Sequence, residues 1–180
     1  GVDKTHSFLS GKVVAEACFS SGTSSLCPNG QKEQIGSGSG VNCSSSISGC
    51  EHGTHVAGIA AGKKTLCTDG TYCMRGVAPK ANIIAIQVFH KVTGWSSCDY
   101  EGSSCVRTNK SDYTLALDRV YELRNSYNIA SVNMSLGGSG STSYCDYSNS
   151  SVKASIDQLR SVGIATIIAS GNDGYSNSIS

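Results

Sequence analysis

The chain has 180 residues, of which 38% are hydrophobic and 15% are charged, and this length fits one globular domain. Its formal net charge of +1 provides no strong field for nucleic acid or for an anionic membrane, so we expect neither partner. No apolar run approaches the roughly 20 residues that span a bilayer. The first residues lack the basic and apolar regions of an export signal, so we expect any such signal to lie outside this sequence.

The amino-terminal part of the chain predicts one short strand and one unusual helix. Residues 13–15 are the strand, and residues 20–49 form a polar stretch of turn residues and cysteines without a core element. The helix follows at 51–62, and its three glycines oppose it by about 1 kcal/mol each, so tertiary packing must hold it. We expect His52 at its amino end to face solvent or a substrate, and His55 to point inward with Val56 and Ile59.

The middle of the chain predicts a buried strand, an insertion and a second helix. Residues 83–89 are an almost continuous apolar run, which is typical of a central parallel strand covered on both faces. Residues 91–110 are an insertion. Ser111 is the predicted cap of a helix whose repeating positions are Leu117, Val120, Tyr121 and Arg124.

The carboxyl-terminal part repeats the order of strand, helix and strand. Residues 130–135 are a strand, Ser151 caps the helix, and residues 164–169 are a further buried strand. The helix has Val152, Ile156, Leu159 and Val162 on one face and ends at Gly163. Alternating strands and helices predict an α/β fold with a doubly wound parallel sheet, in which sites gather beyond the carboxyl ends of the strands.

The cysteines indicate an oxidising compartment, because nine of them fall mainly in polar loops where disulfides persist only after export. The simplest pairing is local and leaves Cys145 over: Cys18 with Cys27, Cys43 with Cys50, Cys67 with Cys73, and Cys98 with Cys105. An alternative is a zinc-binding module, because Cys43, Cys50, His52 and His55 are four zinc-type ligands within thirteen residues.

Four segments in order resemble the subtilisin-like serine proteases, the subtilases. Residues His52-Gly53-Thr54-His55-Val56-Ala57-Gly58 are similar to the family's histidine signature, and Gly76-Val77-Ala78-Pro79 is similar to the turn before its next core strand. Residues 131–138 resemble the strand that ends in Ser-Leu-Gly-Gly, and residues 169–174 resemble the strand end with the oxyanion-hole asparagine. The chain is therefore identified as a segment, 1–180, of a subtilisin-like catalytic domain with disulfide-bearing loop insertions.

The resemblance implies a role for each matched residue. His52 is the expected general base and Asn172 the expected donor to the oxyanion. The resemblance further implies a specificity pocket with Ser135, Leu136, Gly137 and Gly138 on one wall and Ser170 and Gly171 on the other. It places a substrate-pairing edge near residues 109–111. We expect the side chains of His52 and Asn172 to converge on one peptide carbonyl.

Two parts of the family's catalytic triad do not match any residue in this sequence. Gly1-Val2-Asp3 resembles the end of the aspartate motif, which puts the catalytic aspartate two positions before Gly1 and leaves Asp3 a structural role. No segment matches the Gly-Thr-Ser-Met-Ala motif of the nucleophile at the expected place, so we expect the segment alone to be inactive. Asp-Thr or Asp-Ser directly before Gly1, with Gly-Thr-Ser-Met downstream, distinguishes the enzyme from a non-catalytic extracellular binding module.

The resemblance also bears on partners and cofactors. It implies a peptide or protein substrate, and contacts with a propeptide or with the rest of the catalytic domain. Calcium is common in the family, and residues 68–71 lie where a calcium loop can occur. Because Cys67 and Cys73 are expected to replace that loop's ion with a disulfide, we assign no cofactor and no metal site.

Overall fold

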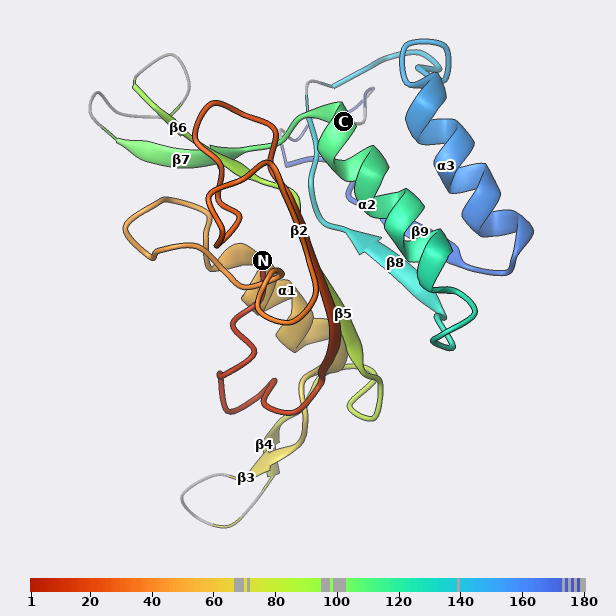
Figure 1. Ribbon diagram of the computed structural model, residues 1–180. Coiled ribbons are helices and arrows are strands. Elements are labelled where there is room, and N and C mark those ends of the chain that lie inside the picture. The colour runs from red at the N-terminus through yellow and green to blue at the C-terminus, as the bar shows by residue number, and fades with distance from the viewer. Residues whose placement is uncertain are drawn as a thin grey trace. The chain divides into compact units, whose positions relative to one another are not determined.

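The computed structural model describes residues 1–66, 70, 72–94, 98, 103–138, 140–172, 174, 176 and 178, with the backbone alone at residues 72 and 73. The chain divides into two compact units, Gly1–Ala116 and Leu117–Ser180, and each is described by itself (Figure 1). A single domain over 1–180 therefore stays a prediction.

A mixed three-stranded sheet organises the first unit. Strand β1 (Val13–Phe19) lies between β2 (Glu33–Ile35), which is antiparallel to it, and β5 (Ile83–Gln87), which is parallel to it. Strand β5 is rich in isoleucine, which favours a pleated and half-buried surface. The expected central place of β5 is not observed in the described sheet, because β1 occupies the centre and β5 an edge.

Helix α1 (His52–Ala61) packs through its small residues, as predicted. Ala57 contacts a buried cluster of Val2, Leu9 and Ala85, which joins the helix to the amino-terminal segment and to β5. An added Cβ at Gly62 would lie only 2.1 Å from the ring of Phe8, so the helix approaches that ring more closely than any larger residue permits. Packing thus compensates for the low helix propensity of its glycines.

Two hairpins complete the first unit. Strand β3 (Thr65–Leu66) pairs antiparallel with β4 (Tyr72–Met74), and β6 (His90–Thr93) pairs antiparallel with β7 (Ser104–Arg107). The second hairpin begins at His90, one residue before the insertion expected at 91–110, and the rest of it lies within that insertion. Figure 1 shows the two hairpins at opposite ends of this unit.

Disulfides close three short loops of the first unit. The bonds join Cys18 to Cys27, Cys43 to Cys50, and Cys98 to Cys105, which confirms three of the predicted local pairs. The predicted pair of Cys67 and Cys73 lies outside the described residues. Cys145, which the local pairing leaves over, is free and exposed.

Helix α2 (Lys110–Leu123) begins before the serine that was expected to cap it. The hydroxyl of Ser111 lies 3.4 Å from the hydroxyl of Ser21 in the stretch 20–32, so it faces that loop. The buried carboxylate of Asp112 accepts the Ser21 N–H at 3.1 Å with both oxygens, and the side-chain amide of Asn109 donates to the Ser21 hydroxyl at 2.9 Å. The predicted cap is therefore wrong, because these side chains bind a distant loop.

The second unit packs α3 and the part of α2 from Leu117 onward on a parallel pair of strands. Strand β8 (Ser131–Met134) pairs with β9 (Ala165–Ile168), and α3 (Ser150–Ser161) connects them in sequence. The Ser155 hydroxyl of α3 donates to the Asp118 carboxylate of α2 at 2.7 Å, and the two helices lie side by side in Figure 1. The buried apolar residues of this unit are Leu117, Val120, Met134, Val152, Leu159 and Ile164.

The ends of α3 correct one expectation and confirm another. The helix begins at Ser150, and the side chain of Asn149 before it binds the carbonyl of Cys145 at 3.1 Å, so Ser151 is not the cap. At the other end Gly163 has a φ of 82°, and the N–H groups of residues 163 and 164 donate to the carbonyls of residues 160 and 159. This Schellman arrangement ends the helix where the glycine predicts.

Strand β9 is more exposed than its apolar sequence predicts. Ile167 and Ile168 are 57% and 49% exposed, so the expectation of a buried strand is wrong for this unit. Side chains of a strand alternate between two faces, and within the described residues 117–172 both helices lie on the same side of the sheet (Figure 1). None of the helices in the described residues is long and apolar enough to cross a membrane.

Candidate active site

His52 is the first residue of α1 and its side chain is exposed, as the sequence predicts. Its backbone N–H donates to the carbonyl of Gly49 at 3.3 Å, and the Cys43–Cys50 disulfide closes the loop directly before it. His52 is therefore the first residue of a helix whose amino end is held in place. An exposed imidazole at such a position is within reach of a bound substrate, as a general base must be.

Two residues of α1 that were predicted to point inward are exposed. His55 is exposed and Ile59 is 57% exposed, so the expectation that both point inward is wrong. The buried positions are Gly58 and Ala61. The helix turns its glycines toward the amino-terminal segment because only residues without side chains permit that close contact, and this rotates His55 and Ile59 outward.

The amino-terminal segment lies against the first turn of α1. An added Cβ at Gly53 would be 2.2 Å from the carbonyl oxygen of Gly1, and the N–H of Asp3 donates to the Thr54 hydroxyl at 2.8 Å. Residues 1–3 therefore run beside His52. Sequence reasoning missed the role of Thr54, because a threonine in the first turn of a helix is common and carries no signal of a distant partner.

The carboxylate of Asp3 accepts hydrogen bonds from within its own turn. Its carboxylate accepts the side-chain hydroxyl of Thr5 at 2.6 Å and the backbone N–H of Thr5 at 2.9 Å. These hydrogen bonds, with that from the hydroxyl the stronger, hold the pKa of Asp3 below its usual value. This arrangement agrees with the structural role expected for Asp3.

In the second unit, the segments after β8 and β9 lie next to each other. The parallel register pairs Met134 with Ile168, and the N–H of Ala169 donates to the carbonyl of Met134 at 3.2 Å. Residues 135–138 and 170–172 therefore leave the same edge of the sheet side by side. The two predicted pocket segments thus begin at the carboxyl ends of two neighbouring strands, and Asn172 belongs to the second segment.

The side chains at this edge are open to solvent. Ser170, Asn172, Gly137 and Gly138 are exposed, and an added Cβ at Gly138 would meet no atom within 4 Å. Gly171 has a φ of 97°, a conformation that favours glycine and that turns the chain just before Asn172.

Ser135, at the same edge of the sheet, is hydrogen-bonded to a side chain of β8, the strand that it follows. Asn133 donates its side-chain amide to the Ser135 hydroxyl at 3.0 Å, and both Ser135 and Leu136 are half-buried. The glycines that follow are exposed, and Gly138 leaves open space at this edge. This edge can bind an extended peptide.

Three further expectations concern a zinc site, residues 68–71 and a substrate-pairing edge. The zinc interpretation is wrong, because the disulfide between Cys43 and Cys50 removes both thiolates, and no cluster of metal-ligating side chains occurs in the described part of the chain. Most of residues 68–71, where a calcium loop can occur in the family and where no metal site was assigned, lies outside the described residues. The substrate-pairing edge expected at 109–111 is not a strand, because α2 begins at Lys110.

Comparison with known proteins agrees with these motifs. A family model described as the Subtilase family matches residues 1–180. Alkaline protease 1 of Aspergillus clavatus is 33% identical over 123 residues, which are 68% of this chain and 23% of that protein. Subtilisin-like protease 2 of Trichophyton equinum is 35% identical over 125 residues, or 68% and 22% of the two chains, and subtilisin E of Bacillus subtilis is 32% identical over 133 residues, or 73% and 27%. The chain spans about a quarter of the length of the curated relatives that it matches.

Proposed function

The chain belongs to the subtilase family of serine proteases, and from this premise we propose that it is a segment of the catalytic domain of a secreted endopeptidase. In the complete domain we expect the parallel strands β1, β5, β8 and β9 to belong to a doubly wound sheet. Export is supported by the three disulfides of the first unit, since such bonds persist in oxidising compartments. The substrates are peptides or proteins.

We assign His52 as the general base. In the complete enzyme a serine hydroxyl attacks the scissile carbonyl, and His52 takes its proton and then delivers it to the leaving amine. Two observations support this role: the imidazole is exposed, and residues 1–3 lie against Gly53 and Thr54 beside it. The orienting aspartate is expected two positions before Gly1. The reaction uses only side chains and backbone N–H groups, so it requires no cofactor.

Asn172 and the pocket residues complete the assignment. The side-chain amide of Asn172 donates to the developing oxyanion. Residues 135–138 bind the substrate backbone on one side, and Ser170 and Gly171 form the other wall. The observation that carries this proposal is the β8–β9 register, which sets these two segments side by side at the carboxyl edge of the sheet.

Hydrolysis of a chromogenic peptide by the longer peptidase that contains this chain tests the assignment. We expect His52→Ala to lower kcat by about 10⁶ and Asn172→Ala by about 10²–10³, both magnitudes being those known for subtilisin itself. His6→Ala is the matched control, because His6 is an exposed histidine outside the proposed site, and it should leave kcat unchanged.

Two results would contradict the proposal. Full activity of the His52→Ala enzyme would remove the assigned base. Complete inactivity of the wild-type longer protein toward every peptide, together with retained peptide binding, would favour a non-catalytic binding module. The segment 1–180 alone is expected to show no turnover.

A further inference from the structure

The side chain of Thr54 binds a segment that is distant in the sequence. Thr54 lies in the first turn of α1, two positions after His52, and its hydroxyl accepts the N–H of Asp3 at 2.8 Å. The two partners are 51 positions apart, and the contact is partly buried. Serine and threonine near the start of a helix usually bind N–H groups of their own helix. A bond to a distant segment therefore indicates a different role for this hydroxyl.

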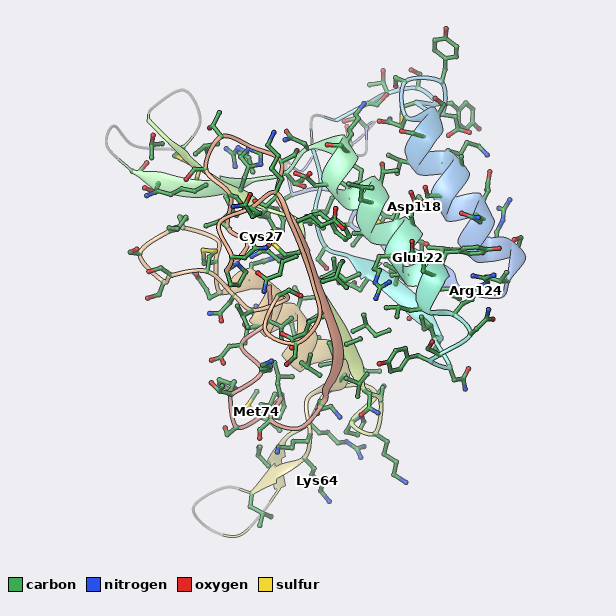
Figure 2. All side chains as sticks on the ribbon, in the orientation of Figure 1. Cys27, Lys64, Met74, Asp118, Glu122 and Arg124 are labelled. Carbon is green, nitrogen blue, oxygen red and sulfur yellow. A yellow bond between two sulfur atoms is a disulfide. The ribbon has the colours of Figure 1, made fainter. Side chains whose placement is uncertain are left out.

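The backbone of residues 1–3 is also held by two neighbouring segments. The N–H of Val2 donates to the carbonyl of Gly40 at 2.9 Å. An added Cβ at Gly53 would lie 2.2 Å from the carbonyl oxygen of Gly1, so the first turn of α1 touches this segment directly. Figure 1 shows the amino end of the chain beside α1, and Figure 2 shows side chains along both segments in the same orientation.

The order of these contacts gives the direction of the chain along the helix. Asp3 contacts Thr54 and Gly1 contacts Gly53, so the chain, followed backward from Asp3, runs toward the amino end of α1. His52 is the first residue at that end, and its side chain is exposed. The aspartate that the proposed function places two positions before Gly1 is therefore expected to approach the imidazole.

The Thr54 hydroxyl is the part of this arrangement that a side chain supplies. The bond from Val2 and the contact at Gly53 involve backbone atoms. Without an acceptor at position 54, the N–H of Asp3 loses its partner, and the segment must shift to find another. A catalytic base works only within hydrogen-bond reach of its partners, and a misplacement of about 1 Å can lower a rate by about 10².

We propose that Thr54 is a positioning residue of the peptidase reaction. Its hydroxyl holds residues 1–3 along the first turn of α1, and this sets the distance between the imidazole of His52 and the aspartate before Gly1. Thr54 acts through these two groups and not through the substrate. The inference rests on the proposed function and adds to it a residue outside the triad and the pocket.

Hydrolysis of a chromogenic peptide by the longer peptidase that contains this chain tests the role. Thr54→Val keeps the shape of the side chain and removes the acceptor, so we expect kcat to fall by about 10–100-fold and KM to change by less than about twofold. This split is expected because the contact serves proton transfer and not substrate binding. Thr54→Ser retains the hydroxyl and should keep kcat close to the wild-type value.

Two further variants separate positioning from a general loss of structure. Thr5→Val removes another hydroxyl bound to Asp3, the one that donates to its exposed carboxylate at 2.6 Å, and should leave kcat unchanged. In a His52→Ala enzyme, Thr54→Val should cause no further loss of kcat, because a residue that acts through the imidazole has no effect when the imidazole is absent. A merely structural role would lower kcat equally in both backgrounds.

Hydrogen exchange at the Asp3 amide reports the contact independently of activity. In the same longer peptidase, Thr54→Val should accelerate exchange at this amide by about tenfold or more, since the N–H loses its acceptor. Thr54→Ser should exchange as the wild type does.

Three results would overturn the inference. Unchanged exchange at the Asp3 amide in Thr54→Val would show that the hydroxyl does not hold the segment. Faster exchange with unchanged kcat in an active enzyme would remove the positioning role and leave the proposed function intact. Inactivity of the wild-type peptidase toward every peptide would contradict the proposed function, and the inference with it.

Discussion

At the scale of single residues, the first unit depends on positions where the backbone is approached too closely for any side chain. Gly76 is the clearest of them. An added Cβ there would lie 2.4 Å from the backbone nitrogen of Gly62 and 2.8 Å from the carbonyl oxygen of Gly58. Because both atoms belong to the end of α1, the contact fixes the segment that follows β4 against that helix.

Gly76→Ala should therefore destabilise the chain by about 1–3 kcal/mol, the usual cost of overpacking a well-packed contact. Gly138→Ala is the control, since an added Cβ at Gly138 meets no atom within 4 Å, and it should change stability by less than about 0.5 kcal/mol. Urea unfolding of both variants measures the difference. Equal stability of the two variants would show that the end of α1 yields to the methyl group.

Glu16 is a second residue whose environment has a measurable consequence. It lies buried on β1, and its carboxylate binds the ammonium group of Lys4 and the N–H of Gly38 at 2.8 Å. Burial alone would raise the pKa of Glu16, but the hydrogen bonds from Lys4 and Gly38 outweigh it and hold the pKa below its usual value.

This lowered pKa predicts how stability responds to acid. The unfolded chain takes up the proton of Glu16 first as the pH falls, so its contribution is full above the ordinary glutamate pKa and is lost as the pH falls through the lowered value. Glu16→Gln should flatten this part of the curve. Thermal unfolding between about pH 7 and pH 3 tests it, and an identical acid dependence of the two proteins would exclude Glu16 as a source.

At the scale of elements, side chains of α2 hold the stretch 20–32 in place by hydrogen bonds. Asp112→Ala removes the only described acceptor of the Ser21 N–H, so we expect a loss of about 1–3 kcal/mol, the cost of leaving a donor unpaired. Asp112→Asn keeps an oxygen in place and should lose less. Hydrogen exchange at the Ser21 amide, followed with thermal unfolding, reports the docking, and unchanged exchange in the Ala variant would contradict it.

Local patterns predicted most elements but not what covers them. The small-residue helix, the strand at 83–87 and the end of α3 at Gly163 follow from packing, apolar runs and glycine conformation, all of which act within a few residues. The caps at Ser111 and Ser151 were wrong because neighbouring polar side chains bind distant or preceding segments. The exposure of Ile167 and of Ile59 could not be predicted, since it depends on which other elements pack there.

Some features of the candidate site could be predicted from the sequence, and others could not. The proximity of 135–138 and 170–172 could be predicted, because parallel strands in register bring their carboxyl ends to one edge. The contact of Thr54 with Asp3 could not, since it joins residues 51 positions apart through one hydroxyl group. The convergence of His52 and Asn172 stays a prediction.

At the scale of the whole molecule, the disulfides are distributed unequally. All three described bonds lie in residues 1–116, whereas Cys145 in the second unit is free. Each bond closes a loop with a sequence separation of 9 or 7, and such closure contributes about 2–3 kcal/mol by restricting the unfolded chain. The two units should therefore respond differently to reduction.

Mild reduction should accelerate backbone hydrogen exchange in residues 1–116 and leave that of 117–172 unchanged. Exchange analysed by mass spectrometry after proteolysis resolves the two units. The oxidised protein with Cys145 alkylated is the control, because it separates loss of the bonds from modification of the free thiol. Equal acceleration in both units would mean that they unfold as one cooperative body.

The pairing of Met134 with Ile168 has a consequence for anyone who wishes to alter substrate preference. Sliding one strand by a single position would turn every side chain of that strand to the opposite face, and sliding it by two would carry Asn172 roughly 6.6 Å along the strand direction. Main-chain hydrogen bonds between β8 and β9 thus set the spacing between the two walls of the proposed pocket. Substitutions meant to alter substrate preference are best made after β8 and β9 end, where the sequence can vary without moving Asn172.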